Sequence, residues 1–181
     1  MQLDAFLALT GANAVTGEST DTTNSTTIEI LQFSLDMARA TNSTVEAFPL
    51  KIIKPIDAAS PALARMATTQ STIGTATLSI CQPASSPTAA AAAARVVIYQ
   101  IILTNVWISR MTVVGAAPMF PMSCGDNWHR DEALWVSPQL AGQGPLELVE
   151  LAYGQVQWNY KGGAGTGTGT ATYKLPSRGA Y

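Results

Sequence analysis

The chain has 181 residues, 47% of them apolar, but only 12% are Asp, Glu, Lys or Arg, and its net charge is −2. This length predicts one domain with its own core, and serine and threonine must cover a surface where soluble domains usually carry about 25% charged residues. So small a net charge attracts neither nucleic acid nor an anionic membrane, which excludes both as expected partners.

The N-terminal region predicts two strands separated by a polar loop. Residues 2–9 form a short strand, and residues 11–27 hold mainly Gly, Asn, Thr and Ser, which predicts a long exposed loop. In the strand predicted at residues 27–35, the apolar positions are even-numbered up to Ile30 and odd-numbered from Leu31 onward. Either a bulge lies near Ile30, or both faces of this strand are covered.

The middle of the chain predicts strands around one short helix. Residues 48–54 and 75–81 have the composition of strands, and Ser60-Pro61 predicts a helix start with Ser60 as its cap. Residues 83–94 are an alanine-rich segment of low complexity. Residues 96–114 are apolar, but polar residues interrupt them and β-branched residues dominate, so they predict strand rather than a membrane span.

The C-terminal third predicts a long insertion, a further strand region and a tail. Residues 115–144 form the insertion, and in residues 146–160 the apolar positions change parity at Gly154, where a bulge or tight bend would fit. Residues 162–181 begin with a Gly-Thr repeat that has no core-forming side chain, so they are expected to be flexible. Many strands and one short helix predict an all-β sandwich or barrel.

The segment MSCGDNWHRDEALW, residues 122–135, holds the densest group of reactive side chains. A zinc site there would use Cys124, His129 and a carboxylate, but His129 is the only histidine of the chain, and zinc sites usually reuse His or Cys. We therefore expect a solvated loop, with no metal, no cofactor and no disulfide between Cys81 and Cys124.

Other arrangements give no active site either. No nucleophile elbow surrounds a serine or cysteine, and the glycine-rich residues 162–165 lack the Lys-Ser/Thr of a phosphate-binding loop. Glu147 and Glu150 lie on opposite faces of their predicted strand, so they cannot converge as an acid–base pair. The sequence therefore predicts no catalytic residue, and a protein that is not an enzyme.

Five segments of the chain follow one another in the order found in a known family. They are GESTD (17–21), IEILQFS (28–34), FPLKIIKPIDAASPALARMA (48–67), VVIYQIILTNVWISRMTV (96–113) and LELVELAYGQVQWNYK (146–161). Over roughly residues 1–114 and 145–161 the chain resembles the haemolysin-coregulated proteins (Hcp), which form the tube of type VI secretion. It is also similar to the tail-tube proteins of other contractile injection systems.

The resemblance implies a β-barrel of two packed antiparallel sheets with one flanking helix, over residues 1–161. It implies six copies per ring, rings stacked into a hollow tube that houses or carries secreted effectors, and contacts with sheath, spike and effector proteins. Such a protein is cytoplasmic while assembled and is secreted without a signal peptide. The start Met1-Gln2-Leu3-Asp4 agrees, because it has no basic segment followed by an apolar run.

Contacts between subunits are expected at the loop of residues 15–27, as a projecting arm that touches the next subunit or ring. A connection of this length without a core residue is usually functional or disordered, so a mobile solvated loop is the alternative. The expected interface residues are Gly17, Glu18, Ser19, Thr20, Asp21, Thr22, Ile28 and Ile30.

Two other functions stay open from the residues alone. A monomeric β-sandwich could bind sugar by stacking it on Trp107, Trp128 or Trp135. A small hydrolase could use His129 as its base.

Overall fold

The computed structural model describes residues 4–39, 45–83, 95–114, 144–162 and 168–175, and strands dominate it. Nine strands form one antiparallel sheet: β1 (Asp4–Thr10), β2 (Ile28–Ile30), β3 (Gln32–Ser34), β6 (Leu50–Pro55), β7 (Thr72–Pro83), β8 (Arg95–Val114), β9 (Leu146–Ala152), β10 (Gln155–Tyr160) and β11 (Gly169–Lys174). A second sheet holds β4 (Met37–Arg39) and β5 (Val45–Ala47). The described residues contain one helix, α1 (Ser60–Thr69), so the all-β prediction is confirmed.

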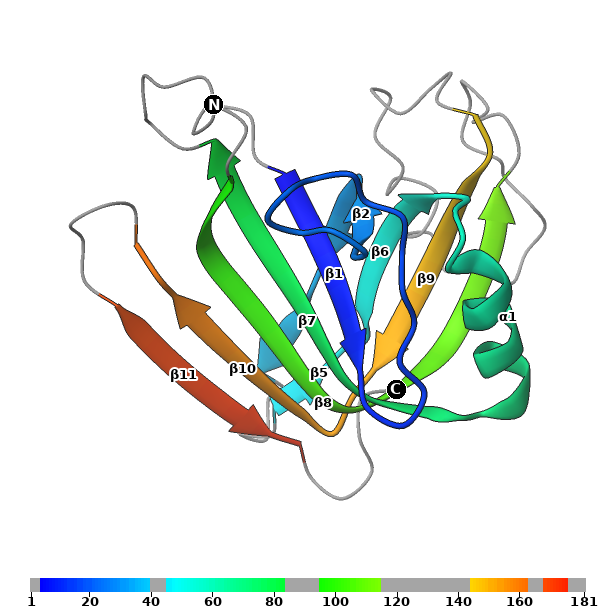
Figure 1. The fold of residues 1–181 in the computed structure, drawn as a ribbon. Coiled ribbons are helices and arrows are strands. Elements are labelled where there is room, and N and C mark those ends of the chain that lie inside the picture. The colour runs from blue at the N-terminus through cyan, green and yellow to red at the C-terminus, as the bar shows by residue number, and fades with distance from the viewer. Residues whose placement is uncertain (1–3, 40–44, 84–94, 115–143, 163–167, 176–181) are drawn as a thin grey trace, which may run out of the picture.

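The long strand β8 organises the sheet. Its first half pairs with β7 and β10, and its second half pairs with β9. Between these halves Asn105 has a positive φ of 54°, and a Cβ on Gly154 would lie 3.3 Å from the Asn105 side chain. Gly154 lies in the short connection between the end of β9 and the start of β10, and the sheet turns sharply there (Figure 1). The bend predicted at Gly154 is therefore confirmed.

The parity change in the second predicted strand marks a break, not a strand with two covered faces. Leu31 separates β2 from β3 and donates its N–H to the Ile53 carbonyl oxygen at 2.8 Å. Ile28 and Ile30 are buried in the core before this break, and Phe33 packs against the same core after it. Ile28, Ile30 and Phe33 therefore face one interior, whereas Leu31 at the break is 36% exposed, so the strand is irregular near Ile30.

The expected barrel of two packed sheets needs correction. The strand order is β2-β1-β7-β8-β9-β6-β3, with β10 and β11 attached beside β8. Since only Leu31 lies between β2 and β3, the sheet curves back on itself. These two end strands do not pair with each other, so the sheet does not close into a barrel. The core is therefore wrapped by a single strongly curved sheet. Its two end strands, β2 and β3, belong to the same short segment of the chain, which brings the two ends of the sheet close together.

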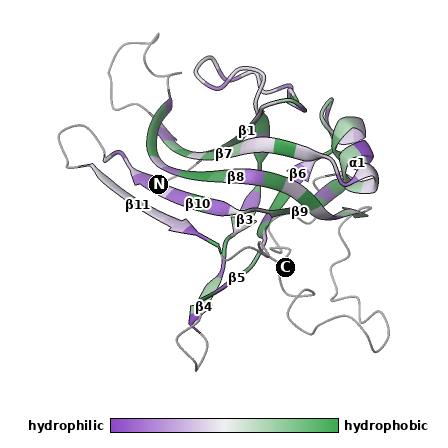
Figure 2. Cartoon of the chain, turned by 90° about the horizontal axis from the view of Figure 1, so that it is seen from below, coloured by the Kyte–Doolittle hydropathy of each residue, from purple (hydrophilic) through white to green (hydrophobic). Residues whose placement is uncertain are grey.

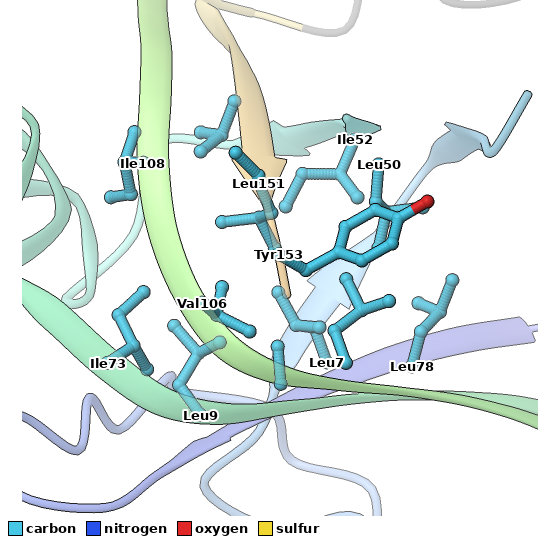
Figure 3. Packing of buried hydrophobic residues seen from close by; sticks show 14 of the residues in the cluster. Leu7, Leu9, Leu50, Ile52, Ile73, Leu78, Val106, Ile108, Leu151 and Tyr153 are labelled. Carbon is cyan, nitrogen blue, oxygen red and sulfur yellow. The ribbon is translucent and has the colours of Figure 1, made fainter. Parts of the chain in front are cut away.

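The core fills the inside of this curve. Figure 3 shows Tyr153 lying among Leu7, Leu50, Ile52 and Leu78, which come from the three strands β1, β6 and β7. Its hydroxyl has no hydrogen-bond partner within the described part of the chain. Burial, with a smaller contribution from Tyr173, raises the pKa of Tyr153 to about 12, so the ring stays neutral at ordinary pH.

The helix α1 is fastened to the sheet by a buried ionic cluster at its start. Lys54 is fully buried, and its Nζ lies 2.8 Å from Glu147 Oε2, 2.7 Å from Asp57 Oδ1 and 3.0 Å from Ser60 Oγ. Ser60 Oγ also donates to Glu147 Oε2 at 2.7 Å. Ser60 is therefore not the helix cap that its position predicts, because its hydroxyl is engaged by the ionic cluster and Ala59 occupies the cap position.

The tail prediction is wrong for one segment. Gly169–Lys174 forms β11, which pairs with the whole of β10, and Leu175 after it is buried. Threonine is a good strand former, and β10 has an edge that the repeat can cover. The alanine-rich residues 84–94, most of the insertion (residues 115–143) and residues 163–167 and 176–181 lie outside the described residues.

Candidate assembly surfaces

The chain from Gly17 to Thr27, named here the covering loop, closes on itself. Gly17 N–H donates to the Thr26 carbonyl at 2.7 Å, and Ser19 N–H donates to the Thr27 carbonyl at 3.1 Å. Compact loops whose two ends lie close together are frequently functional. In Figure 1 the dark blue loop follows β1 and crosses in front of it, so it lies over the sheet instead of projecting as an arm.

One aspartate organises the tip of the covering loop. Asp21 Oδ1 accepts hydrogen bonds from the backbone N–H groups of Thr23 and Asn24, at 3.0 and 2.8 Å. The other carboxylate oxygen lies 3.7 Å from Arg95 Nε at the start of β8. Arg95 Nε also lies 2.8 Å from Asp4 Oδ2. The two groups form an ion pair, but their geometry does not meet the criteria of a hydrogen bond. Arg95 thus joins the loop tip to the beginning of β1.

The covering loop hides a small apolar patch on the outer face of the sheet. Phe6 alternates with core residues of β1, so it faces away from the main core, yet it is buried. Asp4 and Phe6 stand opposite Cys81 and Ser79 in the ladder, so these side chains share that face. Asn24 Nδ2 lies 3.9 Å from Cys81 Sγ, and burial raises the pKa of the Cys81 thiol.

The predicted interface residues divide into three groups. Glu18, Thr20 and Thr22 are exposed on the outer side of the loop and are free to meet a neighbour. Gly17 closes the neck, and Ser19 and Asp21 turn inward; Ser19 Oγ lies 3.3 Å from Glu29 Oε1. Ile28 and Ile30 are core residues, only 0% and 6% exposed, so they cannot contact a second subunit. Both lie in β2, before the break at Leu31, and pack in the core of their own subunit.

Replacing Gly17 with alanine is expected to destabilise the protein by about 1–3 kcal/mol. A Cβ at this position would lie 2.2 Å from the Thr27 carbonyl oxygen, so the neck of the loop must open. Urea unfolding of the two proteins measures the loss. Gly169→Ala is the control, because nothing lies within 4 Å of its added Cβ; equal stability of both variants would contradict the neck geometry.

A second surface is the open edge of β11, which the sequence did not reveal. Within the described residues no strand pairs with its outer side. Leu175 N–H donates to the Gly154 carbonyl at 3.0 Å, and alternate residues of an antiparallel strand point their backbone groups to opposite edges. Thr170, Thr172 and Lys174 therefore direct their N–H and C=O groups outward. Nearly all β11 side chains are exposed, so this edge is a template for strand pairing.

A third exposed element is the β4–β5 hairpin. Figure 2 shows it extending away from the curved sheet. Met37 stands opposite Ala47, and Arg39 stands opposite Val45, while Val45 and the following Phe48 are among the exposed large apolar residues. Short strands that carry exposed apolar side chains suit a contact with another chain.

The structure also tests the other functions that the residues left open. The described residues contain no group of three or more potential metal ligands, and Cys124, Trp128, His129 and Trp135 lie outside the described ranges. Trp107 is partly buried and packs against the core. No helix in the described part is long and apolar enough to cross a membrane.

The two glutamates of β9 do not converge. Glu147 contacts Lys54 at 2.8 Å in the ionic cluster, whereas Glu150 lies 3.9 Å from Arg110 and opposite Lys51. Each carboxylate has a cation of its own, as the opposite strand faces predict.

Comparison with known families decides the identity. The family described as "Type VI secretion system effector, Hcp" matches residues 6–160. The chain belongs to the Hcp family. Hcp proteins are tube proteins of type VI secretion, so the resemblance seen in the five ordered segments is confirmed. No curated protein matches the chain significantly.

Solved Hcp structures share the fold. Hcp1 from Salmonella typhimurium is 21% identical, with a TM-score of 0.67 over 96% of this chain and 95% of that one. A type VI secretion system effector from Yersinia pestis is 18% identical, with a TM-score of 0.66 over 95% and 100%. The secreted protein Hcp3 from Pseudomonas aeruginosa is 14% identical, with a TM-score of 0.63 over 96% and 100%. At these identities the likeness concerns the fold of this Hcp chain.

Proposed function

We propose that this Hcp chain is the subunit of the inner tube of a type VI secretion machine, with six copies per ring and rings stacked into a hollow tube. The observation that carries the proposal is the open edge of β11, which ends a broad sheet without a bulge or a proline. Isolated proteins usually protect such edges. A ring protects every copy of the edge at once, because each subunit covers its neighbour.

The low charge supports assembly from the same surface. Only one residue of β11, Lys174, is charged, and β10 contributes amides and aromatic rings, including the exposed Tyr160. Little charge must therefore be desolvated when two copies meet. The hollow tube would house or carry secreted effectors and contact the sheath and spike proteins. On this proposal the tube is cytoplasmic while assembled, and the protein is secreted without a signal peptide.

Ring stacking is assigned to the outward side of the covering loop. Glu18, Thr20 and Thr22 lie there, exposed and held on a folded loop. Hydroxyl groups can donate and accept hydrogen bonds across a stack. Because the inner side of the loop is already bound to the sheet, these residues can meet a second ring with little further ordering of the loop.

Changing both Thr20 and Thr22 to arginine is expected to shorten tubes strongly while rings persist. Two cations on each subunit repel their counterparts and lose the hydroxyl contacts across the stack. Negative-stain microscopy gives tube length, and analytical ultracentrifugation gives the mass of the ring. A control places the same two charges at the exposed helix positions Ala64 and Thr68; tubes of normal length from the loop variant would refute this stacking surface.

A further inference from the structure

The covering loop is held to the sheet without any apolar side chain. Its sequence, GESTDTTNSTT, contains only glycine, hydroxyl, amide and acidic residues. Apolar burial is the main favourable contribution to folding, and segments with few apolar contacts open locally at a lower free energy than global unfolding. The surface beneath is different, because Phe6 and Cys81 are both buried there.

We propose that the covering loop is a strap that opens while the curved sheet stays folded, that the contact of Asp21 with Arg95 is its latch, and that opening uncovers the patch of Phe6 and Cys81. The latch lies at the tip, farthest from the neck formed by Gly17 and Thr27.

The two oxygens of Asp21 connect the shape of the tip to the latch. Oδ1 holds the turn through the N–H groups of Thr23 and Asn24, while Oδ2 faces Arg95. Arg95 Nε also lies 2.8 Å from Asp4 Oδ2, a contact that involves no loop residue and can therefore persist in the open state. The sheet below is tied by seven residue pairs between β1 and β7, from Asp4–Cys81 to Thr10–Thr75. None of these pairs includes a residue of the loop, so the ladder can stay paired while the loop opens.

The state of the strap can be read from Cys81. The thiol is fully buried beneath Asn24 in the closed state, and thiol reagents attack only an accessible thiolate. Its rate of modification therefore measures opening. Cys124 is the other cysteine of the chain, so Cys124→Ser leaves Cys81 as the only reporter.

The test compares three proteins in the Cys124→Ser background, labelled with a small aromatic disulfide in the absence of denaturant. Asp21→Asn weakens the latch and is expected to label about tenfold faster than the parent protein. Glu18→Gln removes an exposed charge from the same loop and should label at the parent rate. Adding about 1 M salt should accelerate the parent more than Asp21→Asn, because salt screens the ion pair.

Two results would overturn the strap. One is a parent labelling rate equal to the global unfolding rate extrapolated from urea; the other is Asp21→Asn labelling at the parent rate. If Asp21→Asn does not fold, amide exchange of the parent protein decides the question. The N–H groups of Ser19 and Thr26, which are bonded inside the loop, should then exchange much faster than that of Leu78 in β7, and equal protection would contradict local opening.

Discussion

Replacing Lys54 with methionine is expected to lower the free energy of unfolding by about 3–5 kcal/mol. Lys54 is fully buried and is the cation for both Glu147 and Asp57, which are themselves almost fully buried. Methionine has a similar shape, so it leaves no large cavity. It does leave the carboxylates of Asp57 and Glu147 buried without their cation. Urea unfolding followed by circular dichroism measures the loss.

Two further variants separate charge from packing. Lys51→Met removes a lysine from the same strand, but this side chain is partly exposed and stands opposite Glu150, so it should cost less than about 1 kcal/mol. The double variant Lys54→Met with Glu147→Leu also removes one of the two carboxylates left unpaired in the interior, so it should recover much of the lost stability. If Lys54→Met and Lys51→Met were equally mild, the buried cluster would not be what holds α1 to the sheet.

Replacing Thr172 with proline is expected to dissociate the rings into single subunits that remain folded. Thr172 stands opposite Gln157 of β10, and alternation along the strand points its N–H to the open side of β11. Proline removes this donor from the proposed contact between subunits but keeps the backbone groups that face β10, and proline is tolerated on edge strands. Analytical ultracentrifugation at micromolar concentration measures the shift in mass.

Thr172→Val is the matched control, since it keeps the N–H and favours strand structure. It should assemble like the parent protein. Thermal unfolding of Thr172→Pro checks that the subunit remains folded, with a midpoint a few degrees lower at most. Rings of full mass from a folded Thr172→Pro protein would show that copies of the chain do not associate through the β11 edge.

Several local features could be predicted because neighbouring residues encode them. The parity changes at Leu31 and Gly154 both mark irregularities of strands, and the structure places a break or bend at each. Pro61 lies in the first turn of α1, whose buried side contains Leu63 and Met66. Alternation and helical spacing report which side of an element faces the core, and this needs no knowledge of the partner.

The sequence by itself determined the all-β class, the position of the single described helix, the bend at Gly154 and the likeness to Hcp proteins. The tertiary structure decided where polar segments lie. Asp21 meets Arg95, and Lys54 meets Glu147 at a separation of 93 residues, so the polar loop lies over the sheet and a lysine enters the core. Likewise the Gly-Thr segment becomes β11 because β10 has an edge to cover. Apolar alternation is a local property of the chain, whereas the pairing of charges and strand edges depends on which distant residues the fold brings together.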